Sequence, residues 1–282
     1  MNTSVVPDLI LEPLVRNALQ EDLGSYGDIT TRCVIPSDTQ YKARLNSRAD
    51  AVVSGMQVAA LAFRLVDPTL EVTTHFGDGE ACKSGDTLME ISGSAASILS
   101  AERVALNFAG RLTGIATMTA GFVAETKGTS TRVTCTRKTT PGLRIVEKLA
   151  VLHGGGFNHR YSLSDAILIK DNHIAAAGGV SAALIAAKAN ASHMMAVEIE
   201  VDTLAQLEEV LATGGASAVL LDNMDNATLV KAVEMVSGRM TTEASGNVKL
   251  DRIASIAATG VDYISSGALT HSAQTVDLGL DF

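Results

Sequence analysis

The chain has 282 residues and a formal net charge of −9, so it can bury a large core, either as one α/β domain or as a barrel with a smaller partner domain. Only 4% of the residues are aromatic, and the chain is acidic and carries no basic tail, which argues against nucleic acid as a partner. The three cysteines, Cys33, Cys82 and Cys135, are far apart, which argues against a disulfide framework and favours a reducing compartment.

The start of the chain, MNTSVVPDLILEP, lacks the cationic region of a signal peptide, and no apolar run approaches the length of a membrane span. We therefore expect a cytoplasmic protein without a membrane partner.

The first 112 residues are predicted to form an N-terminal α+β domain. Apolar residues at helical spacing indicate a helix over 8–22, and a second helix is expected over 56–65. Short runs punctuated by turn residues predict strands over 41–46, 51–54, 70–75 and 87–91.

An alanine-rich stretch, 97–127, follows and is predicted to be helical. Gly110 and Gly114 lie inside it, and glycine lowers helix stability, so we expect a break or very close packing there. Arg103 and Arg111 are the cations of this helix, and solvated surface charges are their simplest interpretation.

Beyond residue 127 the pattern changes to alternating strands and helices, which predicts a parallel sheet. Strands are expected over 132–136, 165–169, 195–199, 218–221, 241–244 and 263–265, and helices over 141–152, 180–190, 202–213, 226–236 and 249–258. The predicted fold is α/β: an open or incomplete parallel β/α barrel of about six to seven strands over 113–272, beside the N-terminal domain. The tail, 273–282, is expected to pack back on that domain.

The carboxyl ends of barrel strands meet at one rim, where catalytic residues collect. In chain order these ends carry Arg137-Lys138, Lys170, Glu200, Asp222, Ser245-Gly246 and Ser266-Gly267. The segment 136–173 contains six Lys/Arg and three Asp/Glu, a net +3 that leaves −12 for the rest of a −9 chain. Such a concentration of cations in an acidic protein predicts an anion site.

Glu198 and Glu200 lie two residues apart on one strand, so both face the barrel interior, where a carboxylate needs a cation or a metal. An ion pair with Lys138 or Lys170 is one explanation. In the other, Glu200 and Asp222 hold Mg²⁺ or ribose hydroxyls. Glu198 is one layer deeper, which favours a structural role.

Glycine after the last two strands lets backbone N–H groups approach a phosphate. The segments Ser245-Gly246-Asn247 and Ser266-Gly267-Ala268 occupy the usual phosphate position of a barrel. We find no cysteine–histidine cluster with metal-ligand spacing, no dinucleotide or Walker motif and no serine–histidine–aspartate order. His153 is ambiguous, and His173 is expected to support the site rather than to react.

Several motifs resemble those of the quinolinate phosphoribosyltransferase family. They are EDLG with GDITT, ERVALNFAGRLTGIAT, RKTTPGLR, GGGFNHR, DAILIKDNH and the C-terminal GVDYISSGALTHSAQTVDLGLDF. The resemblance implies transfer of phosphoribosyl from phosphoribosyl pyrophosphate to quinolinate, giving nicotinate mononucleotide, pyrophosphate and CO₂, with Mg²⁺ as cofactor. It also implies a homodimer or a higher oligomer, possibly a hexamer, with shared active sites.

By the same resemblance, quinolinate is bound by Arg137, His159, Arg160 and Arg103 from a partner subunit. Lys138, Lys170, Glu200 and Asp222 are the implied catalytic residues. The implied contacts to phosphoribosyl pyrophosphate are those four with Ser245, Gly246, Asn247, Ser266, Gly267, Ala268 and His271. Glu200 and Asp222 are the implied Mg²⁺ ligands, partly through substrate and water.

Three alternatives stay open at this point. A family branch could act on another substrate, or the chain could be a non-catalytic phosphate-binding relative. A barrel lyase could instead use Lys138 or Lys170 as a Schiff-base lysine, which requires a desolvated lysine.

Overall fold

The computed structural model describes residues 6–282, and their contacts group into two compact units. Unit 1 comprises residues up to 120 together with 140–155 and 272–282, and unit 2 comprises 121–139 and 156–271. The sequence pattern placed one boundary at residue 112 and assigned the segment 140–155 to the barrel. In the structure this segment groups with unit 1 instead.

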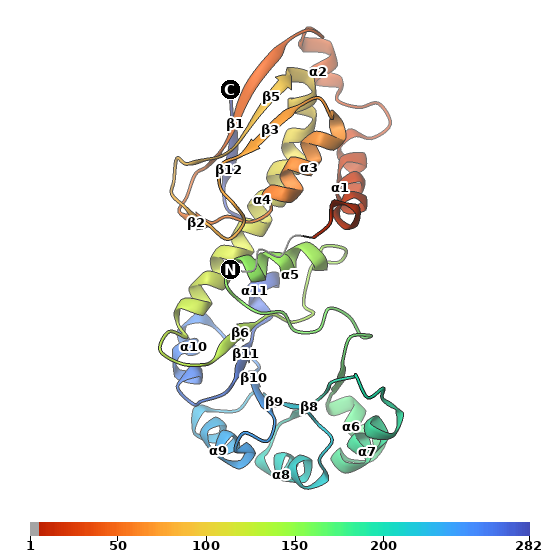
Figure 1. Cartoon of the computed structure of the whole chain (residues 1–282), viewed down its shortest axis with the longest axis vertical. Coiled ribbons are helices and arrows are strands. Elements are labelled where there is room, and N and C mark those ends of the chain that lie inside the picture. Colours follow the sequence, from red (N-terminus) through yellow and green to blue (C-terminus); the bar gives the residue numbers. More distant parts are fainter. Residues whose placement is uncertain (1–5) are drawn as a thin grey trace. The chain divides into compact units, whose positions relative to one another are not determined.

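Unit 1 is built on a four-stranded antiparallel sheet in the order β12-β1-β5-β3 (Figure 1). These strands are β1 (Gln40–Ser47), β3 (Glu71–Thr74), β5 (Thr87–Ser94) and β12 (Leu278–Asp281), and β2 (Ala51–Val52) pairs separately with β4 (Ala81–Cys82). The helices are α1 (Asp8–Leu23), α2 (Ile29–Val34), α3 (Met56–Val66), α4 (Ala95–Ala124) and α5 (Arg144–His153). The C-terminal strand β12 thus completes the sheet of the unit that the first residues begin.

Helix α4 is continuous over 30 residues, so the helix does not break at Gly110 and Gly114. The alternative expectation of close packing is met instead. A Cβ on Gly110 would lie 2.7 Å from the carbonyl oxygen of Val276, and one on Gly114 would overlap the carbonyl oxygen of Gln274. The two glycines therefore provide the space in which the tail, 272–277, runs along α4.

Unit 2 contains a six-stranded parallel sheet in the order β6-β11-β10-β9-β8-β7. The strands are β6 (Arg132–Thr134), β7 (Ile167–Ile169), β8 (Val197–Val201), β9 (Ala218–Asp222), β10 (Thr241–Ser245) and β11 (Tyr263–Ser265). Within residues 6–282, the edge strands β6 and β7 do not pair with each other, although a single parallel bridge joins Thr134 to Phe157. The open parallel β/α barrel predicted from the strand pattern is confirmed.

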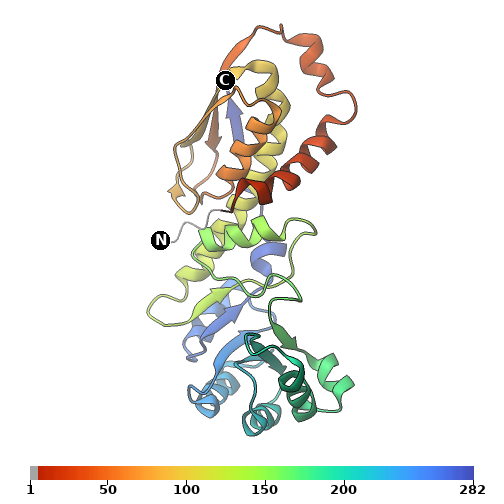
Figure 2. The same cartoon turned by 45° about the vertical axis from the view of Figure 1, so that its right-hand side comes forward.

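Helices cover the outer side of this sheet, as Figure 2 shows for the green-to-blue half of the chain. They are α6 (Asp171–Ala177), α7 (Val180–Asn190), α8 (Leu204–Thr213), α9 (Asn226–Val236) and α10 (Leu250–Ala257). The short helix α11 (Ala268–His271) follows the carboxyl end of β11. Side-chain caps fix where α8 and α9 begin, because Thr203 accepts from Gln206 N and Asp225 accepts from Thr228 N. In the part of the chain described, no helix is both long and apolar enough to cross a membrane.

Candidate active site

The side chains predicted at the barrel rim of unit 2 do lie at or just beyond its strand ends. Asp222 and Ser245 are the last residues of β9 and β10, Lys170 follows β7 directly, and Ser266 follows β11. Because these strands are parallel neighbours in one sheet, their carboxyl ends share an edge. Polar groups from strands that are distant in sequence therefore meet at one rim.

Two arginines at this rim have guanidinium nitrogens without acceptors. The Nε atoms of Arg137 and Arg160 are buried and have no hydrogen-bond partner among residues 6–282. Burial lowers the pKa of Arg160, and the positive charge of Arg137 lowers it further. Arg160 is held by a bond of 2.8 Å from Nη1 to the carbonyl oxygen of Ala166. Two desolvated like charges with unfilled donors form a site suited to an anion.

The two lysines at the rim, Lys138 and Lys170, have different partners. The ammonium of Lys170 forms an ion pair with Glu200, which is one of the two pairings expected from the sequence. Lys138 lies against the last segment predicted to bind phosphate: its carbonyl oxygen accepts from Thr270 Oγ1 at 2.7 Å, and a Cβ on Gly267 would come within 2.7 Å of its Cδ. Both lysines thus border the rim next to groups predicted to bind a phosphorylated sugar.

In the segments 245–247 and 266–268, neighbouring side chains lie so close to the glycine that a Cβ would contact them. Gly246 has φ 92°, and a side chain there would overlap the amide oxygen of Asn223, which accepts from Asn247 Nδ2 at 3.1 Å. At the next strand end, a Cβ on Gly267 would lie 3.1 Å from the His271 ring. Ser266 is buried and accepts from the backbone N–H of Ala268 at 3.3 Å.

Glu200 and Asp222 form the oxygen-donor set predicted for Mg²⁺. Both are half-buried, Glu200 pairs with Lys170, and Asp222 accepts from Asn223 Nδ2 at 2.5 Å. Carboxylates that keep part of their surface open suit a cation that also takes substrate oxygens and water. The residues present therefore fit Mg²⁺.

Below the rim lies a buried cluster that the sequence did not reveal. Nε2 of His159 is 2.8 Å from Glu198 Oε2 and 3.9 Å from Glu243 Oε2, and all three groups lie within 4.8 Å of one another. Burial raises the pKa of Glu243 to about 7, the negative charge of Glu198 raises it too, and His159 opposes the rise. Glu198 is one layer deeper than Glu200, as predicted, but its partner is a histidine rather than a lysine.

Glu243 is the residue of this cluster that sequence reasoning missed. It lies two positions before the strand end Ser245 in TTEAS. The two-residue period of a strand places both on one side of the sheet, as it does for Glu198 and Glu200. This spacing is the signal that could have identified it.

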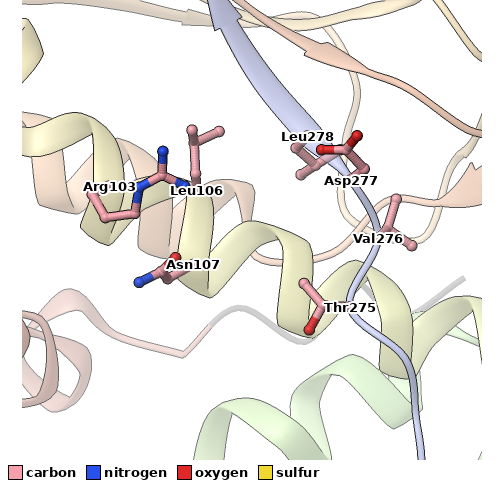
Figure 3. Close-up of a pocket in the computed structure, with 7 residues that line it drawn as sticks. All are labelled: Arg103, Leu106, Asn107, Thr275, Val276, Asp277 and Leu278. Carbon is pink, nitrogen blue, oxygen red and sulfur yellow. The ribbon is translucent and has the colours of Figure 1, made fainter.

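Arg103, predicted to reach the site of a partner subunit, lies on α4 in unit 1. Its side chain is 63% exposed and lies 3.9 Å from Glu102. Figure 3 shows it on α4 facing the tail, where it borders an open hollow of about 520 Å³. The hollow is lined by Arg103, Leu106, Asn107, Thr275, Val276, Asp277 and Leu278. An exposed arginine of this kind is available to a second molecule.

Arg111, interpreted from the sequence as a solvated charge, is instead partly buried and paired. Its Nη2 donates at 2.9 Å to Glu147, a fully buried carboxylate of α5, and its Nη1 donates to the carbonyl oxygen of Ala273 at 2.9 Å. Glu147 also accepts from the backbone N–H and the hydroxyl of Thr140. The pair therefore joins α4, α5 and the tail inside unit 1.

His153 and His173, the two histidines outside the predicted ligand set that the sequence analysis considered, have structural contacts. His153 Nδ1 lies 2.8 Å from the hydroxyl of buried Ser54 in unit 1. His173 Nδ1 accepts from the backbone N–H of Lys170 at 2.9 Å and so caps the start of α6. His173 therefore supports the site indirectly, because it fixes the backbone of Lys170 just after β7.

Family models match almost the whole chain. The model of the C-terminal domain of quinolinate phosphoribosyl transferase matches residues 115–281, and that of its N-terminal domain matches residues 28–113.

Individual proteins give the same result over nearly full length. Quinolinate phosphoribosyltransferase [decarboxylating] 1b of Nicotiana tabacum is 42% identical, with 97% of this chain and 83% of that protein aligned. The probable nicotinate-nucleotide pyrophosphorylase [carboxylating] of Bacillus subtilis is 38% identical, with 97% and 93% aligned. The crystal structure of NadC from Streptococcus pyogenes has a TM-score of 0.95 at 40% identity, covering 99% of this chain and 98% of that one.

Proposed function

The chain belongs to the quinolinate phosphoribosyltransferase family, and we propose that it transfers phosphoribosyl from phosphoribosyl pyrophosphate to quinolinate with decarboxylation. The products are nicotinate mononucleotide, pyrophosphate and CO₂. The observation that carries this proposal is the pair of half-buried arginines, Arg137 and Arg160, whose buried Nε donors lack acceptors within residues 6–282. Quinolinate carries two carboxylates that match these donors.

The dicarboxylate is held by charge-assisted hydrogen bonds. Each bond from a guanidinium to a carboxylate contributes about 1.5–3 kcal/mol, and an arginine can bind a carboxylate with two parallel N–H groups. The mutual repulsion that lowers the pKa of Arg160 is relieved when a dianion binds between it and Arg137. Arg103 of the partner subunit supplies a further cation, so the active form is a homodimer or a larger oligomer.

Phosphoribosyl pyrophosphate binds at the same rim, at the carboxyl ends of β10 and β11. The phosphate lies against the segments Ser245-Gly246-Asn247 and Ser266-Gly267-Ala268 with His271, where glycine permits a close approach to the backbone. Lys138 and Lys170 neutralise the pyrophosphate. Glu200 and Asp222 hold the ribose hydroxyls and would hold Mg²⁺, which, when bound, supplies positive charge to the leaving pyrophosphate.

The reaction then needs positioning and electrostatics rather than a nucleophilic side chain. The ring nitrogen of quinolinate attacks the anomeric carbon while the bond from that carbon to pyrophosphate breaks. The carboxylates at the rim stabilise the positive charge that develops on the sugar. The quaternised ring nitrogen next accepts electron density as the bond from C2 to its carboxylate breaks, CO₂ leaves and C2 takes a proton from water.

Two further points belong to the proposal. Lys170 is paired with Glu200, whereas a Schiff-base lysine must lie unpaired in an apolar pocket, so the structure favours phosphoribosyl transfer over a lyase reaction.

A cytoplasmic location is supported by the three free cysteines, of which Cys33 is exposed.

The test is to incubate the purified protein with phosphoribosyl pyrophosphate, Mg²⁺ and quinolinate, and to follow CO₂ and mononucleotide. Nicotinate replaces quinolinate as the control substrate. We expect turnover with quinolinate only. The Arg137→Ala variant should raise KM for quinolinate and lower turnover, whereas Arg64→Ala, at an exposed arginine of α3, should leave both unchanged. Tight binding of phosphoribosyl pyrophosphate without quinolinate turnover would refute the assigned substrate.

A further inference from the structure

Asn223 directly follows β9 and bonds to groups predicted to bind both the ribose and the phosphate. We propose that Asn223 is a positioning residue for phosphoribosyl pyrophosphate: its side-chain amide fixes the carboxylate of Asp222 relative to the phosphate segment 245–247. Asn223 acts through these groups and not by touching the substrate. This inference rests on the proposed function, which assigns the ribose to Asp222 and the phosphate to the segment 245–247.

The amide of Asn223 joins the ends of two neighbouring strands. Its Nδ2 donates at 2.5 Å to Asp222, the last residue of β9, and a carboxylate can only accept, which fixes the orientation of the amide. Its Oδ1 accepts from Nδ2 of Asn247 at 3.1 Å, two residues beyond the end of β10. The carboxylate of Asp222 therefore cannot shift relative to the segment 245–247 without breaking one of these bonds.

The backbone is fixed at the same place. The N–H of Asn223 donates to the carbonyl oxygen of Ser245 at 2.9 Å. Asn223 and Asn247 have φ values of 53° and 50°, and within residues 6–282 only Ser237 shares a positive φ with them among residues other than glycine. Such conformations are costly, although less so for asparagine, and they persist where the surrounding contacts impose them. The two bonded asparagines are therefore held in place and do not form an ordinary turn.

Gly246 leaves the space that the amide fills. A Cβ at this position would lie 2.3 Å from Oδ1 of Asn223 and 2.5 Å from its Cγ. Any side chain at residue 246 would displace the amide, so the glycine serves the contact with Asn223 as well as the approach of a phosphate.

Helix capping does not explain the two asparagines. Asp225 caps the start of α9 by accepting from the backbone N–H of Thr228, and Lys249 is the residue that precedes α10. The link between the two strand ends is therefore the role that the contacts of Asn223 support.

Loss of the amide should weaken the binding of one substrate only. Asn223→Gly removes the amide, and glycine adopts a left-handed conformation without steric strain. We expect KM for phosphoribosyl pyrophosphate to rise about tenfold, while KM for quinolinate stays at the wild-type value. The control is Ser237→Gly, at an exposed residue with φ 47° that ends α9, which should leave both KM values unchanged. An equal rise in both KM values for Asn223→Gly, or no rise in either, would overturn the proposal.

A double-mutant cycle decides whether the two asparagines act together. Asn247→Gly removes the donor to Oδ1 of Asn223 and also tolerates the left-handed backbone. If the residues act as a linked pair, the rise in KM for phosphoribosyl pyrophosphate in the double variant is smaller than the product of the two single rises. A rise equal to that product would overturn the proposal, because it would show that the two residues act independently.

Direct binding gives a readout that does not depend on turnover. Calorimetric titration of the wild type and Asn223→Gly with phosphoribosyl pyrophosphate and Mg²⁺, without quinolinate, should give a Kd about tenfold higher for the variant. An unchanged Kd would overturn the proposal. If the wild type binds phosphoribosyl pyrophosphate but does not turn over quinolinate, the proposed function fails, and the two Kd values still decide the role of Asn223.

Discussion

Replacement of Glu243 by glutamine should make the protein more stable at mildly alkaline pH and leave it nearly unchanged in acid. Glu243 is 6% exposed on β10, and its Oε1 has no hydrogen-bond partner in the chain from residue 6 onward. The carboxylate of Glu198 is nearby and disfavours a second negative charge, while His159 partly compensates. Glutamine keeps the shape of the side chain and cannot ionise.

The size of the effect follows from proton linkage. The pKa of Glu243 is raised from 4.5 to about 7 in the folded protein. Below the lower value, folded and unfolded chains are both protonated and nothing is lost. As the pH rises from 4.5 to about 7, the unfolded chain releases its proton while the folded chain retains it, so folding becomes less favourable. At about 1.4 kcal/mol per pH unit, the full loss is at most about 3.5 kcal/mol above neutral pH.

Thermal unfolding of the wild type and Glu243→Gln at about pH 5 and about pH 8 measures this loss. We expect the variant to gain up to about 5–10 °C in Tm at the higher pH and little at the lower pH. Glu208→Gln, at an exposed position of α8, controls for the general change of charge. A gain of the same size at both pH values would refute the reasoning, because it would show that Glu243 does not titrate between them.

Three further substitutions test the packing. Glu147→Gln leaves Arg111 half-buried without its charged partner and should cost about 3 kcal/mol in the free energy of unfolding by denaturant titration; a wild-type midpoint would contradict a structural role for the pair. Gly114→Ala pushes a methyl group into the carbonyl of Gln274 and should lower the free energy of unfolding by at least about 2 kcal/mol. Backbone amides of the tail, 272–277, should then exchange hydrogen faster, and unchanged exchange would contradict the close contact. Thr203→Ala removes the cap of α8 and should cost about 1 kcal/mol, which the same titration measures; no loss would contradict the capping bond.

The architecture of unit 2 could be predicted because its signals are local. Short β-rich runs alternate with helical patterns, and the six expected strands all exist, with ends shifted by a few residues. The charged residues at the strand ends follow from the same pattern, since parallel strands bring their carboxyl ends to one edge. The short helix α6 was missed because its first turn, which starts with Asp171-Asn172-His173, has no apolar periodicity.

What could not be predicted depends on contacts between residues far apart in sequence. The pattern of α5 fits a barrel helix, and nothing in it shows that its buried Glu147 bonds to Arg111, 36 residues earlier. The cluster of His159 with Glu198 and Glu243 likewise joins one loop and two strands. Periodicity shows which side of a strand a residue faces, but the partner on that side is fixed only by the fold.

The position of β12 has a consequence for how the chain is made. Its register with β1 pairs Leu278 with Ser47 and Asp281 with Arg44, so the sheet that β1 belongs to lacks an edge strand until residues 278–281 have been synthesised. Until then, β1 presents unpaired backbone groups, which in a nascent chain invite pairing with other strands. The sheet of unit 1 is therefore complete only once residues 278–281 have been made and can reach β1, and a variant without these residues would leave that edge of β1 open.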